Sequence, residues 1–271
     1  MTTVADQATR FRQLHDGPAP LVMPNPWDAG SARLFAHLGF QALATTSSGF
    51  AGTLGRLDGN VSRAEALAHA QAIVAATDLP VNGDLENGFG DAPEAVAATI
   101  EGALDVGLSG GSVEDYTGRP DDPIYERAAA VARVAAAAEV AHGGEVPFVL
   151  TARAENHLHD RADLADTIER LQAFQEAGAD VLYAPGLRDV AQIGTLVRAV
   201  DRPVNVLLLP GGPDVGALAE VGVRRISVGG ALSFVAADAV ANAARELLEQ
   251  GTTSFMPRVV DGARVARRAW R

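Results

Sequence analysis

Three acidic residues and one arginine stand at the ends of apolar segments, where they could bind a cation and an anion together. Asp84 and Glu86 follow one segment, Glu114 ends the next, and Arg153 ends a third. Carboxylates that converge repel one another, and Mg²⁺ relieves that repulsion with one or two direct carboxylate ligands and several waters. The pattern predicts Mg²⁺ held directly by Asp84, with Glu86 and Glu114 acting through water. An ordinary acidic turn is the alternative interpretation of Asp84 and Glu86.

Arg153 is the expected partner of an anionic substrate. Its planar guanidinium can bind two carboxylate oxygens at once and stays charged in a partly dry cavity. A structural ion pair with the nearby Glu155 is the alternative. Ser48 and Gly49 follow another apolar segment and could offer a hydroxyl and a backbone N–H to an anionic oxygen.

These residues lie in a chain where short apolar segments alternate with longer helical ones. Apolar runs without in-and-out alternation are typical of buried parallel strands. Eight such alternations predict an α/β fold, a (β/α)₈ TIM barrel, with residues 1–271 as a single domain. The active site of such a barrel lies at the carboxyl ends of its strands, where the polar residues above fall. The segments are 21–26, 42–48, 80–85, 108–114, 147–153, 179–185, 203–210 and 224–230.

Local signals define several helices between these segments. Residues 62–77 open with a capping box formed by Ser62 and Glu65, and residues 93–107 begin at a proline, as helices often do. Residues 254–270 are basic and amphipathic, and we interpret them as a packing or subunit-contact element rather than a membrane anchor.

Composition excludes several classes of function. The formal net charge of −12 argues against nucleic acid or an anionic membrane as a partner. The chain has no cysteine, which excludes disulfides, thiolate metal sites and cysteine catalysis. The first 17 residues lack the apolar core of a signal peptide, and no apolar run is long enough to span a bilayer, so we expect a soluble, cytoplasmic protein.

Several motifs together resemble the isocitrate lyase / phosphoenolpyruvate mutase superfamily. The likeness extends over about residues 20–230, and its motifs occur in the order of the barrel strands. They are Pro24-Asn25-Pro26-Trp27-Asp28-Ala29-Gly30-Ser31-Ala32-Arg33, Thr46-Ser47-Ser48-Gly49, Gly55-Arg56-Leu57-Asp58-Gly59, Pro80 to Gly90 around Asp84 and Glu86, Val113-Glu114-Asp115, and Ala152-Arg153-Ala154-Glu155.

The resemblance implies a barrel whose last helix is exchanged between subunits, usually in a tetramer built as a dimer of dimers. Residues 232–271 would then be a C-terminal helical segment that makes subunit contacts. It also implies Mg²⁺, or Mn²⁺ in its place, a small-molecule oxyacid substrate, and chemistry through an enolate or an equivalent oxyanion next to a carboxylate.

Site roles carry over by position. Ser48 and Gly49 would bind the oxyanion and Arg153 the substrate carboxylate. Asp58 and Asp84 would support and ligate Mg²⁺, while Glu86 and Glu114 would hold its waters. The remaining expected residues are Trp27, Ser47 and Asn205 for substrate binding and Tyr116, with Arg119, as a mobile acid or second clamp.

Departures from the family pattern limit which reaction is expected. The lyase branches carry a Cys-containing run after the fourth strand, where this chain has residues 116–126 without Cys. The phosphonate branch expects a loop Asn and, after the sixth strand, His and Ser, where this chain has Ala184-Pro185-Gly186. The second acid of the metal motif is Glu86 rather than Asp.

The sequence therefore predicts a Mg²⁺-dependent enzyme that acts on a small α-keto or α-hydroxy carboxylate and cleaves or rearranges a C–C or P–C bond, with the loop 115–127 closing over the substrate. A class II pyruvate-type aldolase, which would release pyruvate and an aldehyde, is one alternative. A keto-acid-binding protein without turnover is the other.

Overall fold

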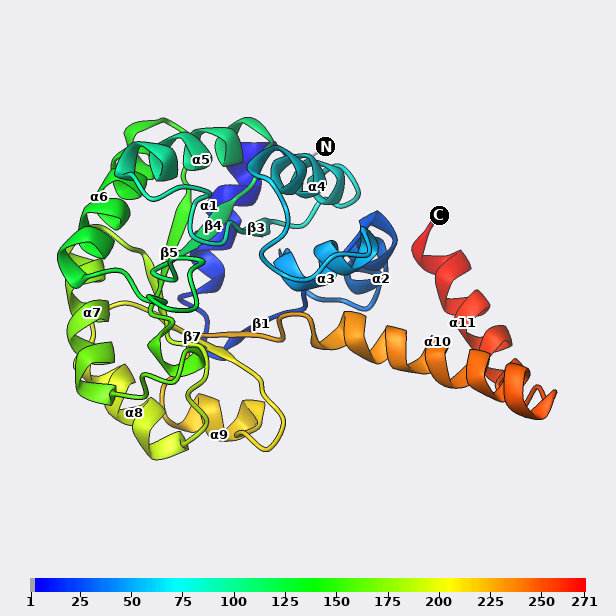
Figure 1. The fold of residues 1–271 in the computed structure, drawn as a ribbon. Coiled ribbons are helices and arrows are strands. Elements are labelled where there is room, and N and C mark those ends of the chain that lie inside the picture. The colour runs from blue at the N-terminus through cyan, green and yellow to red at the C-terminus, as the bar shows by residue number, and fades with distance from the viewer. Residues whose placement is uncertain (1–2) are drawn as a thin grey trace.

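A computed structural model describes residues 3–271 of the chain. Eight parallel strands form one sheet that curls into a barrel, with helices on its outside, as Figure 1 shows. The predicted (β/α)₈ barrel is confirmed, and each of the eight predicted segments contains one strand. The strands are β1 (Leu21–Met23), β2 (Leu43–Ala44), β3 (Val81–Asp84), β4 (Gly110–Glu114), β5 (Val149–Arg153), β6 (Val181–Tyr183), β7 (Val204–Leu207) and β8 (Arg225–Ser227).

Strand pairing runs in the order β1-β8-β7-β6-β5-β4-β3-β2. A backbone hydrogen bond from Ala44 N–H to the Pro24 carbonyl, 3.1 Å long, links the two ends of the sheet and brings the barrel close to closure. Within the sheet, Asp84 is paired in register with Ser112, and Glu114 with Arg153. The register therefore gathers the predicted acidic residues and the arginine on neighbouring strands at one end of the barrel.

The helices on the outside follow the predicted signals. The Ser62–Glu65 capping box is present at the start of α4, and α5 begins at Pro93. The helices of the barrel are α1 (Val4–Leu14), α2 (Ala29–His37), α3 (Ser47–Thr53), α4 (Arg63–Val74), α5 (Pro93–Asp105), α6 (Arg127–Gly143), α7 (Leu164–Glu176), α8 (Val190–Ala199) and α9 (Val215–Glu220), with a 3₁₀ turn at Asn156–Leu158.

Side chains alternate between the inside and the outside of the barrel along each strand. On β5, Leu150 and Ala152 belong to the main core between strands and helices, whereas Val149 packs inside the barrel with Phe11 of α1. The buried Phe11 closes the interior with an apolar layer that also contains Leu21 and Val181. Polar residues occupy the positions nearer the carboxyl ends of the strands, so the apolar floor supports a polar chamber above it.

The last two helices leave the barrel. The helix α10 (Ala231–Gln250) extends away from it, and α11 (Met256–Ala269) turns back toward α2, as Figure 1 shows. Neither helix has a buried residue, and the side chain of Leu248 on α10 is 86% exposed. At the far end of α11, Trp270 Nε1 donates to the Gly30 carbonyl across 3.3 Å. Exchange of this segment between subunits stays a prediction.

No helix in residues 3–271 is both long enough and apolar enough to cross a membrane.

Candidate active site

A cavity of about 190 Å³ opens at the carboxyl ends of the strands. Its lining combines residues from several strands with the loop that carries Asp58. A cavity of this size suits a small molecule and its bound waters. Of the predicted site residues, Ser47, Ser48, Asp58, Asp84, Arg153 and Asn205 line this cavity.

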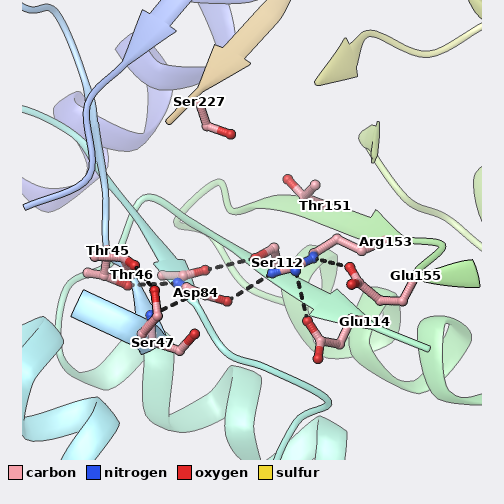
Figure 2. A network of polar contacts seen from close by, with 12 residues as sticks. Thr45, Thr46, Ser47, Asp84, Ser112, Glu114, Thr151, Arg153, Glu155 and Ser227 are labelled. Carbon is pink, nitrogen blue, oxygen red and sulfur yellow. Dashed lines mark hydrogen bonds and ion pairs between the residues drawn. The ribbon is translucent and has the colours of Figure 1, made fainter. Parts of the chain in front are cut away.

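Arg153 is the centre of the polar network in Figure 2. Its Nη1 lies 3.0 Å from Asp84 Oδ1 and its Nη2 lies 3.0 Å from Glu114 Oε2. Its Nε donates to Glu155 Oε1 across 2.8 Å. The ring of Tyr183 lies beneath the guanidinium, 5.2 Å from it. The ion pair with Glu155, the alternative interpretation of Arg153, is therefore present, together with ion pairs to Asp84 and Glu114. A guanidinium has five N–H donors, so two remain for a ligand.

Asp84 is held from two further directions. Its Oδ2 accepts the backbone N–H of Ser47 at 2.9 Å, and its own N–H donates to Thr45 Oγ1 at 2.7 Å. The amide of Ser47 belongs to the first turn of α3, where the helix dipole favours a negative charge. These bonds fix the Asp84 carboxylate at the mouth of the cavity.

The site holds more carboxyl groups than its one arginine can neutralise, and the pKa values of three of them are raised. Burial, with repulsion from Asp84 and Asp58, raises the pKa of Glu86 to about 8. Burial raises the pKa of Glu114 well above its ordinary value although Arg153 opposes the shift. The pKa of Asp58 is also raised, first by desolvation of its carboxyl group, although the residue as a whole is exposed.

The pKa of Arg153 is raised as well, which favours its charged form, whereas a raised pKa favours the neutral form of a carboxyl group. Burial alone would lower the pKa of Arg153, but the surrounding carboxylates, Glu114 first, raise it well above its ordinary value. One guanidinium thus balances only part of the negative charge around it. A second source of positive charge would remove the need for protons on Glu86 and Glu114.

A divalent cation that needs few direct protein ligands fits this arrangement. Within residues 3–271, no three carboxylate or imidazole groups stand close enough together to ligate one ion by themselves. Mg²⁺ keeps several waters and takes one or two direct carboxylates, which Asp84 can supply, while Glu86 and Glu114 would release their protons as the ion binds.

Other predicted residues lie next to the cavity rather than on its lining. The Gly49 N–H donates to Thr46 Oγ1 at 3.3 Å, and a Cβ on Gly49 would stand 2.6 Å from Thr46 Cγ2, so a glycine is needed there. Trp27 packs edge-on against Phe35. The backbone carbonyl of Glu86, a residue with φ of +48°, accepts the N–H of Glu114 at 2.9 Å.

The loop 115–127 lies outside the cavity lining. The ring of Tyr116 stacks on His159 with 4.0 Å between ring centroids. Arg119 forms an ion pair with Asp91 at 3.1 Å, and the Tyr125 hydroxyl donates to the same carboxylate. In this arrangement neither Tyr116 nor Arg119 reaches the cavity, and a role for them requires the loop to move.

Several residues in or next to the cavity are not among those predicted from the sequence. Arg225 of β8 and Tyr183 of β6 both line the cavity, and Thr45 positions the backbone of Asp84. An arginine inside a short buried strand is itself an unusual signal, because a charge in a barrel interior needs a reason. The alternation of side chains along residues 224–230 could have placed Arg225 inward.

Comparisons with known proteins agree with this geometry. The sequence profile of the family described as "Phosphoenolpyruvate phosphomutase" matches residues 11–248. A protein of Burkholderia cenocepacia J2315, described as a lyase/mutase, has a crystal structure with a TM-score of 0.94 and 52% identity, covering 97% of this chain and 95% of its own. The 2-methylisocitrate lyase of Escherichia coli strain K12 is 30% identical over 202 residues, covering 72% of this chain and 67% of the lyase. An oxaloacetate acetylhydrolase, solved with its product oxalate, has a TM-score of 0.85 and 26% identity, covering 92% of this chain and 89% of its own.

Proposed function

Because this chain belongs to the phosphoenolpyruvate phosphomutase family, we propose that it is a Mg²⁺-dependent enzyme that cleaves or rearranges a C–C or P–C bond in a small α-keto or α-hydroxy carboxylate. The observation that carries this proposal is the surplus of carboxyl groups around Arg153 at the mouth of a small polar cavity. A binding protein for a neutral molecule would have no need of that charge distribution.

Asp84 would hold the ion directly, and Asp58, Glu86 and Glu114 would hold its waters. When bound, Mg²⁺ would supply the positive charge that stabilises an enolate or an equivalent oxyanion. Mn²⁺ prefers the same oxygen ligands and could take its place.

The chain's own residues would position the substrate. Arg153 keeps two N–H groups free of its three carboxylate partners and could donate them to the substrate carboxylate. The hydroxyl of Ser48, which lies 3.1 Å from Thr46 Oγ1 and lines the cavity, is placed to donate to a substrate oxygen. The amide of Gly49 could share its long bond to Thr46 with the same oxygen.

The relatives support an oxyacid as the substrate. The names of two of them specify 2-methylisocitrate and oxaloacetate. Both are small acids with a hydroxyl or keto group on the carbon next to a carboxylate. Because this chain has no cysteine, the proton donor to an enolate would have to be a group other than a thiol.

Turnover assays by NMR would test the proposal. Oxaloacetate, 2-methylisocitrate and phosphonopyruvate would each be incubated with the protein and Mg²⁺, with Asp84→Asn as a control. We expect one acid to be consumed by the native protein and not by the variant. A 4-hydroxy-2-keto acid would be included to test the aldolase alternative, which its cleavage to pyruvate and an aldehyde would support. Tight binding without turnover of any acid in a broader panel would support the non-catalytic alternative.

We also propose that residues 232–271 contact a second copy of the chain. The support is that α10 and α11 expose Phe234, Leu247, Leu248 and Val260 by at least half of their surface. Exposed apolar side chains spread along two helices are typical of an interface.

A further inference from the structure

Arg225 is a buried cation in the interior of the barrel, one layer below Ser227 on β8. The residue is 2% exposed. Its Nε donates to Asn205 Oδ1 at 3.0 Å, and its Nη2 donates to Thr151 Oγ1 at 2.9 Å. Both partners are neutral, and its Nη1 is buried without a hydrogen-bond partner.

Within the described residues, no carboxylate forms an ion pair with this guanidinium. Arg225 takes part in none of the ion pairs formed within residues 3–271, whereas Arg153 takes part in three. Burial, followed by repulsion from Arg153, lowers the pKa of Arg225 to about 9, so the side chain remains charged at neutral pH. A buried charge without a counterion carries a large desolvation cost, which an arriving anion would offset.

Arg225 also lines the cavity that Asp84 and Arg153 line. The two arginines differ in the positive charge that they offer to a ligand. Three carboxylates already pair with Arg153, whereas none pairs with Arg225. The cavity therefore has an acidic mouth suited to a cation and an unpaired guanidinium deeper in the barrel. A ligand with an anionic group at each end would match both.

We propose that Arg225 is a specificity-determining residue that binds a second anionic group of the substrate, a carboxylate or a phosphonate at the end away from the α-oxygen. The substrate is accordingly a dianionic oxyacid rather than a monocarboxylate such as pyruvate. This inference rests on the proposed function, because it assumes that the α-oxygen end of the ligand lies at the acidic mouth of the cavity.

Two matched pairs of ligands test it on the full-length protein with Mg²⁺. Malate and 2-hydroxybutyrate share a four-carbon 2-hydroxy acid skeleton and differ in a distal carboxylate. Phosphonopyruvate and 2-oxobutyrate share a pyruvyl group and differ in a distal phosphonate. Dissociation constants would be measured by titration calorimetry. We expect the native protein to prefer the dianion in at least one pair by about 30-fold or more, the scale of a buried charge pair. The pair that shows the preference identifies the distal group.

Variants assign the preference to Arg225. Arg225→Gln should reduce the ratio between the two dissociation constants to within about threefold. Arg225→Lys keeps the charge but loses the planar fork, and should retain about a tenfold preference. Arg224→Gln is the matched control, because the neighbouring Arg224 is exposed and its side chain donates to the Gly17 carbonyl, away from the cavity lining, so the ratio should stay at its native value.

The possible outcomes separate this inference from the proposed function. Equal binding of both members of each pair by the native protein overturns the role of Arg225 and leaves the proposed function standing. A preference that survives in Arg225→Gln also overturns it and assigns Arg225 a purely structural role in the barrel. If the native protein binds no member of either pair, this inference fails, and the turnover assays with the other acids decide the proposed function separately. Should Arg225→Gln not fold, the native ratio and the Arg225→Lys ratio decide.

Discussion

Arg153 Nη1 lies 3.0 Å from Asp84 Oδ1, so the residue expected to grip the substrate is bound to the residue expected to ligate the metal. The contact crosses from β5 to β3 over the intervening β4, whose Glu114 holds the second nitrogen of the same guanidinium. Each carboxylate oxygen has two lone pairs, so Asp84 can keep this bond and still bind a cation. Arg153 therefore holds the acidic residues in place as well as facing the cavity.

Asp84 should be essential for the effect of Mg²⁺. In Asp84→Asn, the side chain keeps its shape but loses the charge that would draw in the cation. We expect the native protein to melt at a higher temperature in Mg²⁺ than in a chelator, and the variant to melt at the same temperature in both. Asp78→Asn, which removes a charge from an exposed position, is the control and should respond as the native protein does. An equal Mg²⁺ response from Asp84→Asn would show that another residue holds the ion.

Removing Arg153 should destabilise the fold strongly. Arg153→Gln leaves the carboxylates of Asp84, Glu114 and Glu155 without their shared cation, and breaking such a buried pair costs about 3–5 kcal/mol. Urea unfolding in chelator would measure the loss. Arg127→Gln breaks the exposed pair with Glu169 and should cost far less than the loss of Arg153, because solvent screens that pair. A similar small loss from both variants would mean that the Arg153 network contributes little to the fold.

Glu86 should make the metal-free protein less stable as the pH rises. Its pKa is raised from 4.5 to about 8 in the folded state, first by burial, so the folded state binds the proton more tightly than the unfolded chain does. Its contribution to stability is fully present below about pH 4.5 and is lost as the pH rises through about 8. Burial lowers the pKa of His15 from 6.5 to about 4. Between these two pH values His15 has the opposite effect, because it makes the folded protein more stable as the pH rises.

Glu86→Gln separates these two contributions. Melting temperatures of the metal-free native protein and the variant would be compared from pH 5 to pH 8. We expect the advantage of the variant over the native protein to grow with pH, because glutamine has no proton to lose. A difference that stays constant with pH would contradict the raised pKa of Glu86. With Mg²⁺ present, the difference in melting temperature between the variant and the native protein should increase less with pH, since the cation replaces the proton on Glu86.

The C-terminal helices should hold copies of the chain together. Leu248→Asp places a charge on the most exposed large apolar residue of α10, and burying an unpaired carboxylate in an interface is costly. Size-exclusion chromatography with light scattering should give an oligomer for the native protein and a smaller species for the variant. Val190→Asp on α8 makes the same change on the outside of the barrel and should leave the oligomer intact. A native protein that elutes as a monomer would contradict the proposed contact.

The barrel could be predicted from the sequence because its strands are short, apolar and punctuated by turns. Their number and order, the capping box of Ser62 and Glu65, and the polar strand ends are all local signals. The same rule placed Asp84, Glu114 and Arg153 at one end of the barrel, because parallel strands bring their carboxyl ends together.

Features that depend on contacts between distant segments could not be predicted in this way. The three ion pairs of Arg153 require the register of β3, β4 and β5, which no local pattern encodes. The packing of Phe11 under the barrel depends on where α1 lies, and the N-terminal segment is polar overall. The direction of α10 could not be predicted from the sequence either, since an amphipathic helix can pack on its own barrel or on that of another copy.

A thermal-shift measurement on metal-stripped protein with small oxyacids, each with and without Mg²⁺, tests most directly whether the cavity binds an oxyacid through a divalent cation. The panel would contain pyruvate, oxaloacetate, oxalate, malate, 2-oxoglutarate, phosphonopyruvate and 2-methylisocitrate. A ligand at 100 times its dissociation constant adds about 2.7 kcal/mol of apparent stability, which such a measurement detects readily. We predict that at least one acid stabilises the protein only when Mg²⁺ is present. No Mg²⁺-dependent stabilisation by any acid would contradict the central claim that this cavity binds an oxyacid through a divalent cation.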